Sequence, residues 1–504
     1  MTRANPGATT AADPDPWPAL VALCIGFFMI LLDTTIVTVA TPAIIEDLDA
    51  EVNSVVWVTS AYLLAYAVPV LITGRLGDRF GPRRLYLAGL AIFTSASLWC
   101  GLTGSVEGLI LARVLQGLGA SMMTPQTMAI ITRIFAVERR GMAMSLWGAT
   151  AGVATLVGPV LGGILVDTLG WEWIFFINVP IGVGAFALAF RLVPRLDTHP
   201  HRFDWLGVAL SGVGMFLLVF GLQEGHQYDW STITGQITVW RMIVAGVVVL
   251  TVFVWWQGRN RGEPLMPLHV FSDRNFSISN LAIATVSFGF TAMGFPLMLW
   301  AQLVRGWSPT ESGMLLIPMA LMSIVLATYV GRLTDRVHPR LLTTFGFVVL
   351  TGAMLLSAAL LEPDTPLWQL LGAMALIGTG SAFLWAVLSA TATRNLPPRL
   401  AGAGSGVYNA LRQVGAVLGS AGIAVLIDDR LAAEGLSAAG GAAQQGTLAP
   451  AAAEAFSDAM AQSLLLVPAV LVLGLLAVML FERPRHFAPL TGGPATVPVA
   501  DQRQ

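Results

Sequence analysis

Stretches of about 20 apolar residues recur from Trp17 to Glu482, each long enough to cross a hydrocarbon core of roughly 30 Å as a helix. With 55% hydrophobic and only 11% charged residues, and a mean hydropathy of +0.73, the chain cannot cover these stretches with a soluble surface. Because lipid offers the backbone no hydrogen bonds, the expected fold class is an all-α polytopic membrane protein with 14 transmembrane helices. The predicted spans are residues 19–41, 54–74, 85–104, 109–133, 142–166, 172–193, 204–222, 238–257, 276–301, 311–333, 341–361, 367–392, 403–427 and 461–482.

Three segments outside these spans are polar or rich in small residues. Residues 1–16 contain no short apolar core followed by a small-residue cleavage site, so they are expected to form a disordered tail and not a signal peptide. The Ala- and Gly-rich stretch 428–460 is expected to be a flexible external loop, and residues 483–504 a second flexible tail.

Arginines mark one side of the membrane, since short cytoplasmic loops retain positive charge. The opposite loops are acidic or neutral, as at Glu46 and Asp47, with Arg305 and Arg430 as exceptions. Both termini are therefore predicted to be cytoplasmic, which requires an even number of spans. The arginines of the cytoplasmic segments are Arg75, Arg79, Arg83, Arg84, Arg139, Arg140, Arg195, Arg202, Arg259, Arg261, Arg274, Arg336, Arg340, Arg394, Arg399, Arg483 and Arg485.

An internal repeat divides the chain. The motif GRLGDRFGPR, which begins at Gly74, returns as GRLTDRVHPR from Gly331, an offset of 257 residues (331 − 74). The motif GPVLGG from Gly158 returns as GAVLGS from Gly415 at the same offset (415 − 158). Two segments that share one offset indicate parallel halves related by an axis along the membrane normal. The expected domains are an N-terminal six-helix half at 17–195, an inserted helix pair at 204–257 and a C-terminal six-helix half at 276–482.

Several functions are excluded because the residue types that they need are absent or lie outside the predicted spans. All 27 basic residues are Arg, so the chain has neither a P-loop lysine nor a Schiff-base lysine. The six histidines fall between or beyond the spans, which leaves no intramembrane haem or His-metal site. Cys24 and Cys100 lie in apolar runs and favour neither a disulfide nor a metal site. The chain is therefore expected not to be an enzyme and to need no cofactor, and its net charge of −2 gives no basic field for nucleic acid.

Three motifs of small and charged residues stand out in the N-terminal half. Small residues four apart allow close helix packing in any membrane protein, and Pro159 adds a bend to span five. The motif residues are Gly74, Leu76, Asp78, Arg79, Gly81 and Arg84 in the first cytoplasmic loop, Arg113, Gln116 and Gly117 in span four, and Gly148, Gly152, Gly158, Pro159, Gly162 and Gly163 in span five.

Together with residues 32–42, 171–180 and 409–415, these motifs make nearly the whole chain resemble the major facilitator superfamily, specifically its 14-span drug:proton antiporters of the EmrB/QacA type. Thr38 and Thr41 depart from the Asn and Leu that are common in that family. The resemblance implies the major facilitator fold in a bacterial cell membrane, proton transfer at the position of Arg113, and export from the span-five motif. The implied partners are a small-molecule substrate, protons and the lipid bilayer; a monomer is expected, with an oligomer left open.

Asp33 is an acid well inside a predicted span, where a charge costs roughly 2.5–3.5 kcal/mol on insertion scales. At about 1.5 Å per residue it lies about 21 Å from the cytoplasmic start of its span, a depth that Arg113 can share. Pairing with Arg113 would keep Asp33 ionised while burial opposes the charge, which makes the two a candidate proton-coupling pair. The alternatives are a purely structural ion pair, or bonds from Asp33 to the hydroxyls of Thr34 or Thr35.

Acidic and basic residues in the two repeat loops are predicted to latch one of two conformations. Positive-inside retention alone would explain the arginines but not the aspartates. The predicted latch comprises Asp78, Arg79 and Arg84, with Gly74 and Gly81, in the first loop and Asp335, Arg336 and Arg340 in the second.

Polar and aromatic residues within the spans are candidates for a substrate cavity. Tyr408 and Arg412 stand four residues apart on span thirteen and should face a cavity, where an unpaired Arg412 would repel cationic drugs. The candidates are Tyr62, Trp300, Gln302, Tyr408, Asn409, Arg412 and Gln413. Trp57, Tyr66, Met122, Met123, Phe288 and Trp385 are further candidates, although such residues more often serve packing.

The resemblance and the sites together favour proton-coupled efflux of drugs or toxic compounds by alternating access, with Asp33 exchanging a proton for substrate. Export of an endogenous metabolite or a self-made antibiotic fits the same residues. Proton-coupled uptake is disfavoured by the Gly158-Pro159 motif, and a non-transporting receptor or scaffold by the presence of Asp33, Arg113 and both loop motifs.

Overall fold

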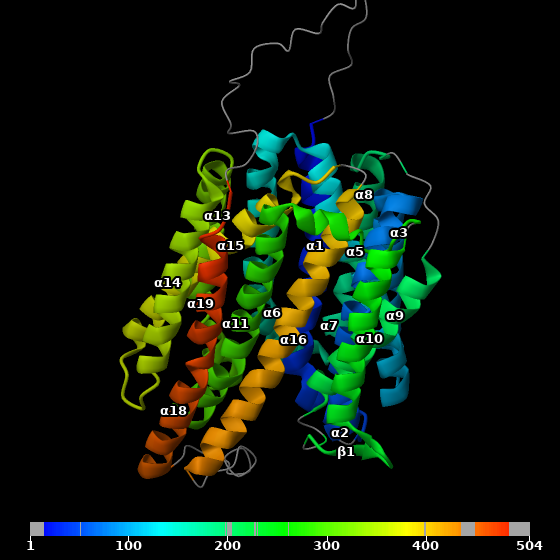
Figure 1. Cartoon of the computed structure of the whole chain (residues 1–504). Helices are drawn as coiled ribbons and strands as arrows, with labels where there is room; N and C mark the ends of the chain where they lie inside the picture. Colours follow the sequence, from blue (N-terminus) through cyan, green and yellow to red (C-terminus); the bar gives the residue numbers. More distant parts are fainter. Residues whose placement is uncertain are drawn as a thin grey trace, which may run out of the picture.

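The computed structural model is a bundle of long helices that run in a common direction (Figure 1). It describes residues 15–50, 52–196, 198, 204–225, 228, 230–260, 262–397, 400–434 and 449–482. Nearly all of the predicted tails, residues 1–14 and 483–504, and the middle of the predicted external loop, residues 435–448, lie outside the described residues. The described chain begins and ends at the same end of the bundle (Figure 1).

Helices make up most of the described chain, and the one hairpin in the described part, formed by β1 and β2, lies at the opposite end of the bundle (Figure 1). The elements are α1 (Trp17–Asp47), α2 (Val52–Ala67), α3 (Val70–Phe80), α4 (Pro82–Leu102), α5 (Val106–Ile134), η1 (Val137–Arg139), α6 (Arg140–Leu169), α7 (Trp173–Phe176), α8 (Asn178–Leu192), α9 (Trp205–Gln223), β1 (Thr232–Thr234), β2 (Ile237–Thr238), α10 (Val239–Arg259), η2 (Leu268–Ser272), α11 (Arg274–Leu303), α12 (Pro309–Met314), α13 (Ile317–Thr334), α14 (Pro339–Ala359), α15 (Leu367–Arg394), α16 (Ala401–Ala433), α18 (Pro450–Leu464) and α19 (Leu466–Val478).

The all-α polytopic fold is confirmed, but the count of 14 spans is not reached among the described residues. Twelve helical segments there are long and apolar enough to cross a membrane, and α2 with α3 makes a thirteenth across a bend of 46°. Pro69 stands at that bend, where its missing N–H interrupts the helix. The remaining predicted span, 142–166, lies in α6, a helix of 30 residues that is not among the thirteen.

The predicted external loop 428–460 is shorter in the structure than the sequence suggested. α16 continues to Ala433 and α18 begins at Pro450, so both ends of that segment are helical. The Ala-rich composition of both ends explains the difference, since Ala favours helix even without an apolar period long enough to predict a span.

Two groups of helices, α1 to α8 (the N-terminal bundle) and α11 to α19 (the C-terminal bundle), each pack mainly among themselves. They meet along two seams: α6 packs against α13 and α15, and α16 packs against α3 and α5. The two seams are related by exchange of the bundles: α3, which carries the first repeat motif, contacts α16 of the C-terminal bundle, and α13, which carries the second, contacts α6 of the N-terminal bundle. The sequence repeat thus has a counterpart in the packing between the bundles.

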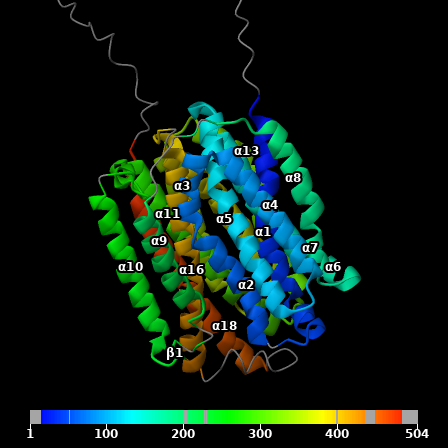
Figure 2. The ribbon, with the colours of Figure 1, turned by 90° about the vertical axis from the view of Figure 1, so that its right-hand side faces the viewer.

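α9 and α10 pack on each other beside the bundle, and Figure 2 shows α10 at the periphery with α9 between it and α16. α9 also contacts α2 and α3, so it covers one seam from the outside. Asp204 joins the ends of the pair, since its carboxylate accepts bonds from Trp256 Nε1 at 2.9 Å, Gln257 Nε2 at 2.8 Å and the N–H of Gly207 at 2.9 Å.

Candidate functional site

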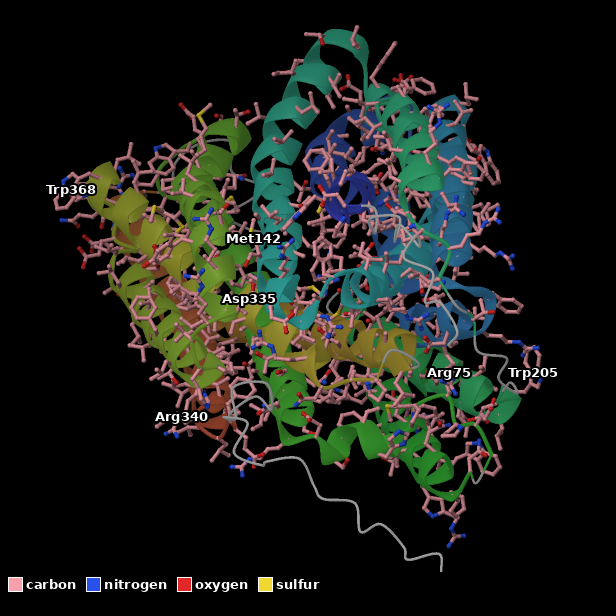
Figure 3. The ribbon with its side chains drawn as sticks, turned by 90° about the horizontal axis from the view of Figure 1, so that it is seen from above. Arg75, Met142, Trp205, Asp335, Arg340 and Trp368 are labelled. Carbon is pink, nitrogen blue, oxygen red and sulfur yellow. The ribbon has the colours of Figure 1, made fainter. Side chains whose placement is uncertain are left out.

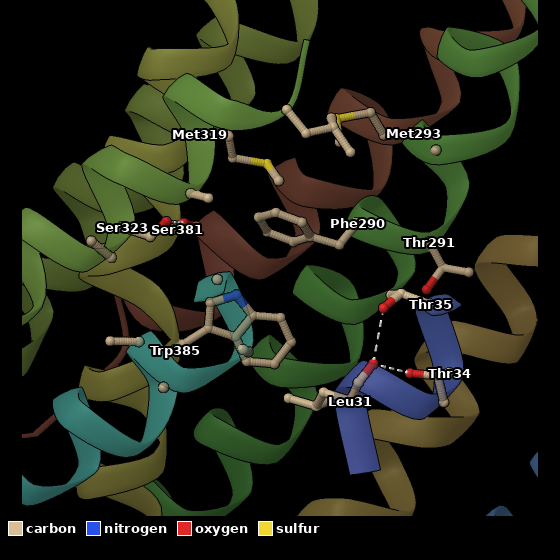
Figure 4. A pocket seen from close by; sticks show the side chains of 18 of the residues that line it. Leu31, Thr34, Thr35, Phe290, Thr291, Met293, Met319, Ser323, Ser381 and Trp385 are labelled. Atoms are coloured by element: carbon tan, nitrogen blue, oxygen red, sulfur yellow. Dashed lines mark hydrogen bonds between the residues drawn. The ribbon is translucent and has the colours of Figure 1, made fainter. Parts of the chain in front are cut away.

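A cavity of about 830 Å³ lies between the two bundles, with walls from α1, α6, α11, α12, α13, α15 and α16. Figure 4 looks into it: the rings of Phe290 and Trp385 lie 5.8 Å apart between centroids, with Met293 and Met319 nearby. Aromatic, aliphatic and methionine side chains make up most of the wall. Such a wall, with a few polar groups, is typical of a site for an amphipathic small molecule.

Several hydroxyl groups in the wall bond to the wall itself. Thr34 Oγ1 donates to the carbonyl oxygen of Leu31 at 2.7 Å, and Ser323 and Ser381 share a bond of 2.8 Å (Figure 4). Thr34 therefore does not bond the neighbouring Asp33, which excludes one of the alternatives for that carboxylate among the described contacts.

Gln302, Tyr408, Arg412 and Trp385 are the sequence-predicted candidates that line this cavity. Phe290 could not be predicted as a wall residue, because an isolated aromatic residue in a span is equally typical of packing or of a lipid contact. The candidates that lie outside the wall are Tyr62, Trp300, Asn409, Gln413, Trp57, Tyr66, Met122, Met123 and Phe288.

Helix geometry explains why neighbours of wall residues face elsewhere. Asn409 follows Tyr408 at about 100° around the helix, and its side-chain amide donates back to the carbonyl oxygen of Ser405 at 2.9 Å. Trp300 is buried and donates from Nε1 to Ser457 Oγ at 3.0 Å. Trp300 therefore joins α11 to α18, and neither Trp300 nor Asn409 lines the cavity.

Asp33 lies in a separate, fully buried cluster inside the N-terminal bundle. Arg113 Nη1 forms an ion pair with Asp33 Oδ2, Gln116 Nε2 donates to Oδ1 at 2.7 Å, and Asn178 Nδ2 donates to the same oxygen at 3.3 Å. Ser97 Oγ accepts from both amides. Asp33 is not among the residues that line the cavity, although its neighbours Thr34 and Thr35 are.

Arg113 is positioned in this cluster by hydrogen bonds and an aromatic contact as well as by its ion pair with Asp33. Nε donates to the carbonyl oxygen of Val58 at 3.1 Å, Nη1 also donates to Gln116 Oε1 at 2.7 Å, and the guanidinium lies 4.1 Å from the Tyr62 ring centroid. Gly117 allows this arrangement, because a Cβ there would lie 2.4 Å from the carbonyl oxygen of Tyr62. The cluster therefore needs the close contact of α2 with α5.

The glycines of the span-five motif serve different contacts along α6. Gly148 and Gly152 line the cavity, and Gly158 allows α1 to pack closely, since a Cβ there would lie 2.0 Å from Thr35 Oγ1. Gly162 is buried, a Cβ at Gly163 would lie 3.9 Å from Thr310 Oγ1 on α12, and Pro159 lies inside α6 without breaking it.

Asp78 joins α3 to the first turn of α16 across one seam. Its carboxylate is fully buried and accepts the N–H groups of Gly402 at 3.0 Å and Ala403 at 2.8 Å. These are among the N–H groups that α16 cannot satisfy internally, and the positive end of its helix dipole favours an anion there. Arg133 Nη2, on α5, contacts Asp78 Oδ1 at 2.7 Å.

Asp335 makes the equivalent contact across the other seam. It accepts the N–H groups of Gly141 at 2.9 Å and Met142 at 3.3 Å in the first turn of α6, and Arg394 Nη2 lies 3.5 Å from its Oδ1. Figure 3 shows Asp335 beside Met142, with Arg340 farther out. Each repeat-loop aspartate thus caps a helix of the opposite bundle.

The remaining predicted latch residues have other positions. Gly74 allows α3 to approach α16, since a Cβ there would lie 2.7 Å from the carbonyl oxygen of Gly402, and Gly81 ends α3 at a φ of 95°. Arg84 and Arg336 are exposed. The two aspartates contact arginines that the predicted latch did not include, Arg133 and Arg394, and Arg75 Nη1 lies 3.9 Å from Asp78. The Arg79 guanidinium lies 5.3 Å from the Phe80 ring centroid, and the backbone N–H of Arg340 donates to Nδ1 of His338, the N-cap residue of α14, at 3.1 Å.

We expect closure of the Asp335 seam to depend on pH. Burial raises the pKa of Asp335 to about 6, against the lowering effects of Gly141, Arg394 and Met142, and Glu138 adds a small raising effect. Since an exposed Asp has a pKa of about 3.9, the closed seam binds a proton that the open seam releases. The closed fraction should therefore fall as pH rises from about 4 through about 6 and level off above about 7.

Spin labels on the exposed Arg139 and Arg336 positions, in a variant lacking Cys24 and Cys100, would measure this dependence as a distance distribution. Asp335→Asn should remove the pH dependence. A closed fraction that rises with pH, or one that keeps its slope in Asp335→Asn, would contradict the assignment.

The Major Facilitator Superfamily model matches residues 23–420 of the chain. The chain is 52% identical over 472 residues to an uncharacterized MFS-type transporter of Mycobacterium tuberculosis, covering 92% of this chain and 81% of that protein. It is 36% identical over 423 residues to the tetracenomycin C resistance and export protein of Streptomyces glaucescens, covering 82% and 77%. The human organic anion transporter MFSD10 has a similar fold, with a TM-score of 0.64 at 14% identity over 92% of this chain and all of that one.

Proposed function

Since the chain belongs to the major facilitator superfamily, whose members are membrane transporters and not enzymes, we propose that it exports small molecules in exchange for protons by alternating access. The observation that carries this proposal is the cavity between two bundles that are joined at one end by the Asp78 and Asp335 contacts. Breaking these contacts at one end while closing the other would expose the cavity to alternate sides of the membrane.

We assign the latched end to the cytoplasm and the cavity to an outward-facing arrangement. The latched end carries the Arg-rich repeat loops, which favour the cytoplasmic side, and it is the end where the described chain starts and stops. In the same proposal α6 is the fourteenth span, because its 30 residues lie between α1 and α13 at the centre of the bundle. The inserted pair α9 and α10 then separates two six-span halves.

Asp33 is the proposed proton carrier. It is the acid inside the N-terminal bundle that accepts hydrogen bonds from an arginine and two amides, so its protonation would remove the charge that Arg113 pairs with. Because Thr34 and Thr35 line the cavity on the same turn of α1, a change at Asp33 can reach the substrate through that helix.

Export is favoured over uptake by the relative named for tetracenomycin C resistance and export, and by the span-five glycines that allow α6 to pack closely on α1. The same relative supports the second candidate function, export of an antibiotic or another endogenous metabolite. Both candidates use the same cavity and the same proton carrier, and they differ only in the source of the substrate.

Everted membrane vesicles energised by respiration test the proposal. A panel of neutral, cationic and anionic fluorescent amphipathic compounds should contain at least one that accumulates only in vesicles that hold this protein, and a protonophore should abolish that accumulation. Accumulation that survives the protonophore would rule out proton coupling, and uptake in the opposite direction, into right-side-out vesicles, would rule out export.

A further inference from the structure

The cavity wall contains four buried polar atoms that have no hydrogen-bond partner in the described part of the chain. They are Ser145 Oγ and Trp147 Nε1 on α6, and Tyr408 Oη and Arg412 Nε on α16. The indole and guanidinium N–H groups can only donate, and both hydroxyl groups can also donate. Buried polar groups normally have hydrogen-bond partners. These four donors lack acceptors in the wall, and a bound ligand would supply them.

Arg412 is the one charged side chain among the described residues that line the cavity. Its Nη2 donates to Tyr66 Oη at 3.0 Å, across the seam to α2, and it forms no ion pair with any residue the structure describes. Asp33 cannot neutralise it, because that carboxylate is already paired with Arg113 in the separate cluster. The cavity therefore carries one net positive charge at this wall.

Tyr408 lies one helical turn before Arg412, so both side chains project from the same face of α16 into the cavity. The Tyr408 ring is fully buried, and its hydroxyl group has no hydrogen-bond partner among the residues that the structure describes. An arginine and a tyrosine hydroxyl on one face form a donor pair suited to a carboxylate or another small oxyanion. Phe290 and Trp385 offer aromatic surface in the same cavity for an attached ring system.

We propose that this cavity binds amphipathic monoanions, with Arg412 and Tyr408 as the anion-binding residues and Phe290 and Trp385 as the contact surface for the apolar part. The inference rests on the proposed function, whose substrate class it names. A lipophilic cation would meet the positive charge of Arg412 with no acid in the described wall to offset it, so cations are poor substrates.

The charge of the substrate fixes how transport responds to voltage. Exchange of one external proton for one internal monoanion moves two positive charges inward per cycle, so both the membrane potential and the pH gradient drive export. Exchange of one proton for one monocation moves no net charge and responds to the pH gradient alone. A steep dependence of export on membrane potential is therefore expected.

Equilibrium dialysis of the full chain in lipid nanodiscs, with naphthoate, naphthamide and naphthylmethylammonium as matched probes, tests the proposal without a proton gradient. Wild-type protein should bind naphthoate about 10-fold to 100-fold more tightly than naphthamide, and the ammonium compound most weakly. Arg412→Gln should remove the preference for naphthoate while naphthamide still binds, which shows an intact cavity. Arg412→Lys should retain part of the preference, and Tyr408→Phe should reduce it several-fold.

The proposal is overturned if wild-type protein binds naphthoate no more tightly than naphthamide, if none of the three probes binds, or if the preference survives Arg412→Gln. The last result would make Arg412 a structural partner of Tyr66 only. Anion binding without protonophore-sensitive export in vesicles would leave the inference standing and refute the proposed function, whereas export of cations alone would do the reverse.

Discussion

Asp33→Asn is expected to abolish proton-driven accumulation of substrate while leaving the exchange of substrate across the membrane intact. One proton that crosses 100 mV supplies about 2.3 kcal/mol, enough to accumulate a neutral solute roughly 50-fold. The amide cannot ionise between conformations, so for a neutral substrate this ratio should fall to about 1 in everted vesicles, and for a monoanion only the accumulation driven by the membrane potential should remain. Counterflow, in which preloaded unlabelled substrate exchanges for labelled substrate, needs no proton and should persist.

The Asp33→Asn variant is expected to lose stability as well as proton coupling, and the two effects have to be measured separately. Asp33→Asn leaves Arg113 buried without its counter-ion, which costs about 3–5 kcal/mol in comparable buried pairs. The double variant Asp33→Asn, Arg113→Gln removes both charges, so it should recover expression and thermal stability yet still lack proton-driven accumulation. Asp49→Asn, at an exposed position two residues after α1, is the matched control and should behave as wild type. Full accumulation in the double variant would remove Asp33 from the coupling mechanism.

The fold could be predicted from the sequence because its strongest determinant is local. An apolar stretch of about 20 residues must be a helix in lipid, and thirteen of the predicted stretches match helices that are long and apolar enough to span. The prediction is wrong in detail where apolar character does not determine the structure. Pro69 bends the helix predicted at 54–74, and α16 continues beyond the predicted span into residues that are helical without being apolar.

The Asp33–Arg113 pair could be predicted from the sequence because a charged side chain is costly in a membrane and the two residues lie at a similar depth in their predicted spans. Asn178 and Ser97, which complete the cluster, were not, since a polar uncharged residue in a span has too many possible neighbours. The contacts of the latch could likewise be predicted only in part. The repeat located Asp78 and Asp335, but their acceptor role depends on backbone N–H groups at the starts of α16 and α6, which no side-chain pattern encodes.

The second large effect is expected from Asp78→Asn, which should shift the protein toward the arrangement that is open on the latched side. Asp78 is fully buried and accepts from Gly402, Ala403 and Arg133. An Asn side chain keeps one acceptor but turns an N–H toward donors that need an oxygen. Removing one partner of a buried, hydrogen-bonded charge pair costs about 2–5 kcal/mol, so the closed-to-open ratio should fall at least about 30-fold.

Spin-label distances between positions 139 and 336 report this ratio directly, and Arg84→Gln provides the matched control. Arg84 belongs to the same loop motif but is exposed, so its loss should leave the distance distribution unchanged if the buried carboxylate forms the latch. If Arg84→Gln opens the seam as much as Asp78→Asn does, the net positive charge of the loop and not the capped helix holds the bundles together.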